Sequence, residues 1–192
     1  QYFGGSEAEM QRISKVVAAI PGIDDTLSLK EVIANGLAQY EAVFIPGGHA
    51  PLIDLANNPE VGTILKHFNA EAKPTAAICH GPIALLSAQQ NPQAFQQALV
   101  QQSPATATNW IYAGYKMTIF SDAEETVFEG SLNGDKLQYY PGKAMQQAGG
   151  AMQYSEAWTP NVVVDRELIT GQNPFSDKAL AQAVLEQLQQ QR

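Results

Sequence analysis

The chain of 192 residues holds one cysteine, Cys79, and one of its three histidines, His80, follows it directly. The cysteine lies between the apolar run 75–78 and Gly81, a strand–turn–helix context that exposes a nucleophile on a sharp elbow. Amides at the start of the following helix favour the thiolate form of such a cysteine. These residues predict a nucleophilic Cys79 with His80 as its base.

A site for a developing oxyanion is expected beside the elbow. The turn Gly47-Gly48 lets the backbone approach a ligand, and the amide of His80 faces the same space as the sulfur. Gly81 allows the sharp bend, and His49 directly follows the two glycines. The residues expected to bind the substrate or its oxyanion are therefore Gly47, Gly48, His49 and Gly81.

A carboxylate is expected to orient His80. Three acidic residues follow the apolar run 115–120, whose end lies at the same edge of the predicted sheet. Asp122 is the expected partner of His80, with Glu124 and Glu125 as less favoured alternatives.

Each of these residues also has a structural interpretation. A cysteine after a strand often packs as a small apolar residue, His49 fits a surface turn equally well, and Asp122 suits a helix N-terminus. Cys79, His80 and His49 could bind zinc together, but they lack a zinc-binding spacing, so no metal site is expected. The glycines of residues 46–50 lack the spacing of a P-loop, which argues against phosphate binding.

Predicted strands and helices alternate along the chain. Apolar runs predict strands at 42–48, 75–79 and 115–120, and two strands joined by a turn at 161–171. Helical periodicity and capping residues predict helices at 6–19, 28–35, 59–71, 81–89, 92–102, 136–148 and 175–190, with a further one beginning at 121–125. This order predicts one α/β domain over residues 1–192, a sandwich with a mainly parallel sheet that binds ligands outside the carboxyl ends of its strands.

Composition and charge narrow the classes of partner. The formal net charge is −8 and the 11 lysines and arginines are scattered, so neither a nucleic acid nor an anionic membrane is expected to bind. No apolar run reaches the length of a membrane span, and no signal peptide is visible. We expect a cytoplasmic protein, or a periplasmic one if Gln1 results from processing.

Three segments, in this order, resemble the ThiJ/PfpI superfamily, which has the class I glutamine-amidotransferase-like fold. The segments are EAVFIPGGHA at 41–50, AAICHGP at 76–82 and WTPNVVVDRELITGQNPFSDKALA at 158–181, and they are most similar to the branch of glyoxalase III and holding chaperones. The resemblance implies a flavodoxin-like three-layer sandwich, often a homodimer. It also implies that Cys79 is the nucleophile, His80 its partner and Asp122 the acidic third member, without a cofactor.

The sequence also departs from the superfamily in three respects. Ala77 replaces the first glycine of the amidotransferase elbow and no histidine follows His80, so a glutaminase triad is not expected. The segment 89–114 is longer than usual and is predicted to form a lid or an oligomer contact. The family's first strand–helix–strand unit, with a glutamate that contacts the cysteine, is expected to be missing from this chain.

The leading functional hypothesis is a cofactor-independent enzyme. Cys79 would attack a small reactive carbonyl such as methylglyoxal, and the product would be a 2-hydroxy acid such as lactate. One alternative is a small cysteine peptidase or amidase that uses the same elbow. The other is a stress protein without enzymatic activity, either a holding chaperone or a thiol redox sensor, because a reactive cysteine oxidises readily.

Overall fold

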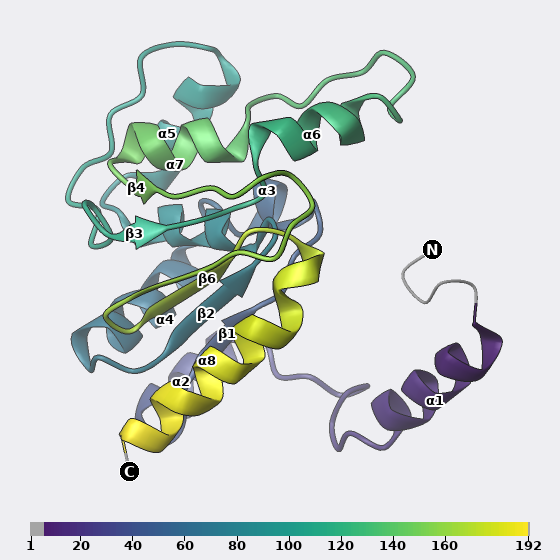
Figure 1. The fold of residues 1–192 in the computed structure, drawn as a ribbon. Helices are drawn as coiled ribbons and strands as arrows, with labels where there is room; N and C mark the ends of the chain where they lie inside the picture. The colour runs from purple at the N-terminus through teal and green to yellow at the C-terminus, as the bar shows by residue number, and fades with distance from the viewer. Residues whose placement is uncertain (1–5, 192) are drawn as a thin grey trace. The chain divides into compact units, whose positions relative to one another are not determined.

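The computed structural model describes residues 6–191, and the chain divides into two compact units with the boundary between Asn35 and Gly36. The described part of the first unit contains helices α1 (Glu7–Ala18) and α2 (Leu29–Ala34) (Figure 1). That residues 1–192 form one domain stays a prediction. No helix among residues 6–191 is long and apolar enough to cross a membrane.

Both helices of the first unit begin at the serines that the sequence predicts as caps. The side chain of Ser6 accepts a hydrogen bond from the amide of Glu9, and Ser28 accepts one from the amide of Glu31. The Glu31 carboxylate also binds the Ser28 amide and completes a capping box. The carboxylate of Glu9 pairs with Arg12 instead, so the box expected at α1 is only half formed.

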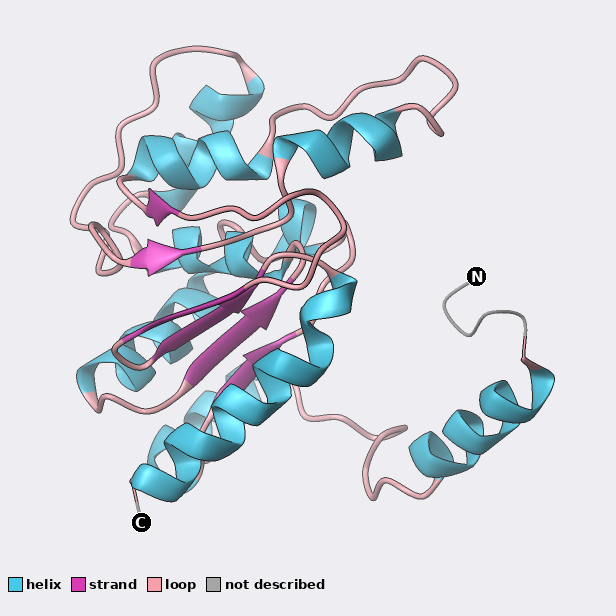
Figure 2. Ribbon diagram, in the orientation of Figure 1, coloured by secondary structure: helices cyan, strands magenta, loops and turns pink. Residues whose placement is uncertain are grey.

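The second unit is an α/β sandwich (Figure 2). Its strands are β1 (Val43–Ile45), β2 (Thr75–Ile78), β3 (Lys116–Met117), β4 (Ala151–Met152), β5 (Val162–Asp165) and β6 (Leu168–Gly171). Its α-helices are α3 (Pro51–Asp54), α4 (Pro59–Ala70), α5 (Pro92–Val100), α6 (Asp122–Glu129), α7 (Pro141–Ala148) and α8 (Asp177–Gln190). Its 3-10 helices are η1 (Leu37–Gln39), η2 (Gly81–Ala88) and η3 (Pro174–Ser176).

The main sheet has the strand order β1-β2-β6-β5. β1, β2 and β6 are parallel, with Ile45 opposite Ala77 and Ala77 opposite Thr170, whereas β5 pairs with β6 as an antiparallel hairpin. The carboxyl ends of β1, β2 and β6 therefore meet at one edge of the sheet. The predicted mainly parallel sheet is confirmed.

Helices cover both faces of this sheet, which gives the predicted three layers. α8 packs on one face against β2, β5 and β6, and α4 and η2 pack on the other (Figure 1). Leu180 of α8 is buried against Ala76 and Ile169. Burial of one such leucine side chain contributes about 1.5–3 kcal/mol to folding.

Three elements differ from their predictions. β3 covers only two residues and pairs with β4 in a separate sheet, because Thr118 donates its amide to the Thr170 side chain rather than to a backbone carbonyl. The segment after Cys79 is the 3-10 helix η2, all of whose residues are buried, rather than an α-helix. Pro141 begins α7 instead of interrupting a helix, since a proline fits the first helical turn.

The segment 89–114 is packed into the second unit. Phe95 and Leu99 of α5 are buried, and the Trp110 indole donates a hydrogen bond of 2.7 Å to the carbonyl of Leu85. These contacts fasten the segment to η2. Its role as a lid or an oligomer contact stays a prediction.

Candidate functional site

Cys79 lies on a strained elbow between β2 and η2. Its φ of 60° falls in the left-handed region, which costs a residue with a side chain about 1–2 kcal/mol. Two backbone hydrogen bonds hold it there, one from its amide to the Gly171 carbonyl at 2.8 Å and one from the Phe120 amide to its carbonyl at 2.9 Å. The elbow is thereby fixed between the end of β6 and the segment that leads into α6.

Two glycines allow the loop after β1 to approach this elbow. A Cβ on Gly47 would lie 2.6 Å from the Cβ of Cys79, and a Cβ on Gly81 would lie 2.5 Å from the Ile45 carbonyl oxygen. Both distances are too short for a real side chain. The Gly47-Gly48 turn therefore lies beside the sulfur, where the sequence predicts it.

Amides at this turn are available to a ligand. In the part of the chain that the structure describes, the amides of Gly48 and His80 donate no hydrogen bond to another chain group. Gly48 has a φ of 92°, which favours glycine. The oxyanion site formed by these amides stays a prediction.

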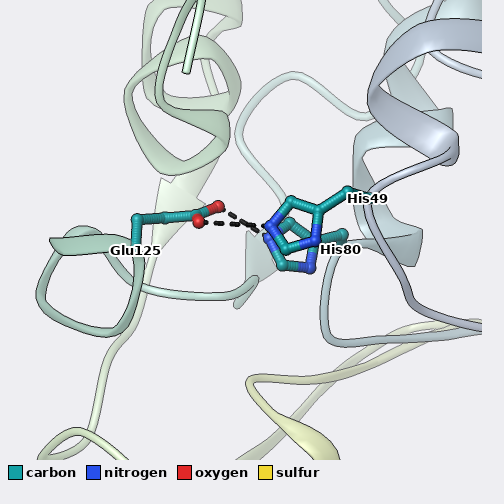
Figure 3. A group of neighbouring side chains, drawn as sticks. All are labelled: His49, His80 and Glu125. Carbon is teal, nitrogen blue, oxygen red and sulfur yellow. Dashed lines mark hydrogen bonds and ion pairs between the residues drawn. The ribbon is translucent and has the colours of Figure 1, made fainter. Parts of the chain in front are cut away.

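His80 links Cys79 to a buried carboxylate. Its Nδ1 lies 3.3 Å from the Sγ of Cys79. Its Nε2 lies 2.6 Å from Oε1 of Glu125, a contact that Figure 3 draws. The side chain of His80 is 2% exposed and that of Glu125 is 0% exposed. The three residues thus lie in the order that a relay of nucleophile, base and orienting acid would need.

The charge balance of this relay favours a protonated His80. Burial by itself lowers the pKa of His80, but the hydrogen bonds to Cys79 and Glu125 and the negative charge of these two groups together raise it to about 9. At neutral pH the imidazole is therefore charged.

Glu125, rather than the expected Asp122, is the carboxylate that contacts His80. Asp122 is the first residue of α6, its side chain is 38% exposed, and its Oδ2 lies 3.5 Å from the Nζ of Lys143. Ser121 is the N-cap of α6 and forms a capping box with Glu124, so Glu124 turns back to the helix start. The carboxylates of Asp122, Glu124 and Glu125 thus lie within about one helical turn, yet each makes different contacts.

His49 is the third ring of the site. It stacks on Phe128 with ring centroids 3.9 Å apart and lies 4.0 Å from the ring of His80. Its Nε2 is 3.5 Å from Oε2 of Glu125, an ion-pair distance without hydrogen-bond geometry. Burial and the adjacent positive charge of His80 lower the pKa of His49, and Glu125 offsets part of this effect.

The donor atoms of His49, His80 and Glu125 all lie within 4.8 Å of one another, an arrangement that could hold a metal ion. The histidines are those considered for zinc from the sequence, but the third ligand group is Glu125 instead of Cys79. No spacing pattern reveals this group, because its members come from three separate segments.

A cleft of about 610 Å³ opens next to the site and has His49 in its wall. Gln93, Gln97 and Val100 of α5 also line this cleft, as does Tyr139. Cys79 is only 8% exposed and does not line it. Of the residues in the site, His49 is therefore the one that faces the cleft.

Sequence reasoning missed the aromatic rings of this site and ranked Glu125 below Asp122. Phe120 packs on His80 with centroids 4.5 Å apart, and Phe128 packs on His49. The motif Ser121-Asp-Ala-Glu124 carried a usable signal, because a capping box fixes the start of the helix and assigns Glu124 to it.

The family comparison covers part of this site. Residues 14–94 match the family described as DJ-1/PfpI, and this range contains both the glycine turn and the Cys79 elbow. This segment belongs to the DJ-1/PfpI family. The resemblance seen in the sequence motifs is thereby confirmed.

Individual curated proteins are also similar to this chain. The protein/nucleic acid deglycase HchA of Pseudomonas aeruginosa is 29% identical over 155 residues, which are 79% of this chain and 48% of HchA. More generally, the chain spans about half to three fifths of the length of the curated relatives it matches, 48% and 59% for two of them.

Solved structures show the same fold. The Rapid Encystment Protein of 24 kDa from Francisella tularensis has a TM-score of 0.72 at 24% identity, covering 91% of this chain and 70% of that protein. Glyoxalase III from Candida albicans has a TM-score of 0.58 at 21% identity, covering 78% and 58%. At these identities the likeness establishes the DJ-1/PfpI fold alone.

Proposed function

We propose that the protein is a cofactor-independent cysteine enzyme that acts on small reactive carbonyls, with an activity of the glyoxalase or deglycase type. The observation that carries this proposal is the buried relay of Cys79, His80 and Glu125, with Sγ–Nδ1 at 3.3 Å and Nε2–Oε1 at 2.6 Å. The similarity to HchA, which is named as a deglycase, supports the same class of chemistry.

The first step forms a covalent bond between Cys79 and the substrate. Before the attack, the thiol proton already resides on His80, whose raised pKa and pairing with Glu125 stabilise the charged ring. The sulfur then attacks the aldehyde carbon of an α-oxoaldehyde, and the electron pair of the C=O bond moves to oxygen. The amides of Gly48 and His80 stabilise this oxyanion, which takes up a proton to give a hemithioacetal.

The second step is an internal proton transfer. A base removes the proton from the carbon bonded to sulfur, and a proton is returned to the neighbouring carbonyl carbon. The hydroxyl proton of the hemithioacetal passes to the ketone oxygen in the same step. The hemithioacetal thereby becomes a thioester and the ketone becomes an alcohol, with no external oxidant. Water then hydrolyses the thioester and regenerates the thiol, so methylglyoxal plus water gives lactate.

The test is lactate formation from methylglyoxal, with both enantiomers assayed. We expect Cys79→Ala to reduce kcat/KM by about 10²-fold or more, because nucleophilic and acid–base groups contribute at least that much. His67→Gln is the matched control, since this histidine of α4 lies outside the relay. A loss below about tenfold in Cys79→Ala would overturn the assignment of the nucleophile.

The alternative functions predict other results with the same variants. A peptidase or amidase predicts an acyl-enzyme burst with an activated ester and no lactate. A holding chaperone predicts protection of an unfolding client protein that survives Cys79→Ala. Either result without turnover of methylglyoxal would replace the proposed function.

A further inference from the structure

The carboxylate of Glu125 faces two imidazole rings at once. Oε1 lies 2.6 Å from Nε2 of His80, and Oε2 lies 3.5 Å from Nε2 of His49 (Figure 3). His49 follows β1, His80 follows β2 and Glu125 belongs to α6. Three segments that are distant in the sequence therefore direct nitrogen and oxygen donors toward a common point.

Two of these donor atoms lack a hydrogen-bond partner among residues 6–191. Nε2 of His49 and Oε2 of Glu125 are buried, and neither makes a hydrogen bond with another described residue. The side chain of Glu125 is 0% exposed. A buried carboxylate oxygen is costly to leave unpaired, so a group that binds it from the His49 side would stabilise the site.

We propose that His49, His80 and Glu125 bind a divalent transition-metal ion. Two imidazole nitrogens and one carboxylate oxygen suit zinc, which in such sites keeps a further position open for an exchangeable ligand. Zinc bonds of about 2.0–2.1 Å at tetrahedral angles separate two donors by about 3.3 Å. The 3.5 Å between His49 and Glu125 fits this spacing, and the 2.6 Å contact of His80 would open by about 0.7 Å.

Metal binding would compete with the relay. The ion takes Nε2 of His80, the nitrogen that otherwise shares a proton with Glu125, and it also takes the carboxylate that orients the ring. The metal-bound form is then an inhibited form, in which His80 cannot carry the proton of Cys79. This consequence rests on the proposed function, whereas the binding itself does not.

The experiment measures zinc binding directly. Untagged protein of the full 192 residues is freed of metal with a chelator and titrated with zinc by calorimetry, and bound metal is quantified after dialysis. We expect one zinc per chain, with affinity reduced more than about 100-fold in His49→Gln and in Glu125→Gln, because loss of a direct ligand exceeds loss of an outer-shell partner. His67→Gln and Cys79→Ser are the controls and should bind as the unchanged protein does.

Thermal unfolding of each metal-free variant verifies that it is folded. His49 is 34% exposed, so His49→Gln gives a readout even if Glu125→Gln does not fold. A cobalt-loaded sample adds a spectroscopic measurement, in which an absence of thiolate charge-transfer bands supports the nitrogen and oxygen ligands. The proposal is overturned if zinc does not bind, if His49→Gln binds it normally, or if Cys79→Ser abolishes binding.

Activity assays separate the two proposals. Reversible inhibition of methylglyoxal turnover by zinc, relieved by a chelator, supports the competition. Stoichiometric binding without inhibition overturns the competition and leaves the metal site. A protein that binds zinc but never converts methylglyoxal refutes the proposed function alone.

Discussion

Glu124 and Glu125 are neighbours in α6, and both are completely buried, yet their surroundings differ. Glu124 accepts five hydrogen bonds, from the Ser121 amide and hydroxyl, the Trp158 amide, and the side chains of Gln172 and Asn173. Among the described residues, Glu125 has one hydrogen bond, to His80, and its other oxygen makes no hydrogen bond. A carboxylate whose oxygens are fully hydrogen-bonded stabilises the fold. A carboxylate with an oxygen that makes no hydrogen bond remains available for chemistry.

The largest effect is expected from Glu125→Gln. The amide removes the negative charge that stabilises protonated His80, so kcat/KM for methylglyoxal should fall by about 10²–10⁴-fold. The melting temperature should change much less than in Glu124→Gln, because Glu125 has fewer partners. Steady-state kinetics and thermal unfolding test this, and near-normal turnover would remove Glu125 from the relay.

Glu124→Gln should have the opposite profile. An amide nitrogen placed among five donors leaves at least one of them unpaired, at a cost of about 1–3 kcal/mol for each buried donor. A loss of about 3 kcal/mol lowers the melting temperature of a chain of this size by roughly 10 °C. Turnover per folded molecule should fall less than about threefold. If Glu124→Gln melts at the normal temperature but is inactive, Glu124 would act in turnover and not in stability.

Unfolding at acidic pH should also show the contribution of Glu124 to stability. Burial raises the pKa of Glu124, but the hydrogen bonds from Ser121, Trp158 and Asn173 outweigh it and hold this pKa below its ordinary value of 4.5. A lowered pKa in the folded state gives stability that is fully present above pH 4.5 and is lost as the pH falls through the folded pKa. Urea unfolding below pH 4.5 should therefore show a shallower pH slope for Glu124→Gln than for the unchanged protein.

The smallest effect is expected from Asp122→Asn. This carboxylate is 38% exposed and contacts Lys143, and such surface ion pairs contribute at most about 1 kcal/mol. Both kcat/KM and the melting temperature should stay close to those of the unchanged protein. A loss comparable to that of Glu125→Gln would restore Asp122 as the orienting acid.

The sequence predicted the parallel strands, the elbow at Cys79 and several N-caps, because each depends on local patterns of apolar residues, glycines and serines. It did not identify Glu125 as the partner of His80. Successive residues of a helix are rotated by about 100°, so the carboxylate that faces the site depends on how α6 packs, which is a tertiary property. β4 covers only two residues and leaves no periodic signal, whereas β3 lies within the strand predicted at 115–120.

The backbone at Cys79 also has a consequence for how this chain tolerates change. A φ of 60° suits glycine better than any residue with a side chain, so Cys79→Gly should unfold at a higher temperature than Cys79→Ala, although both lack the nucleophile. Selection for thermal stability alone would therefore remove the thiol. Under the proposed function, a cysteine at this position gives up conformational stability for reactivity.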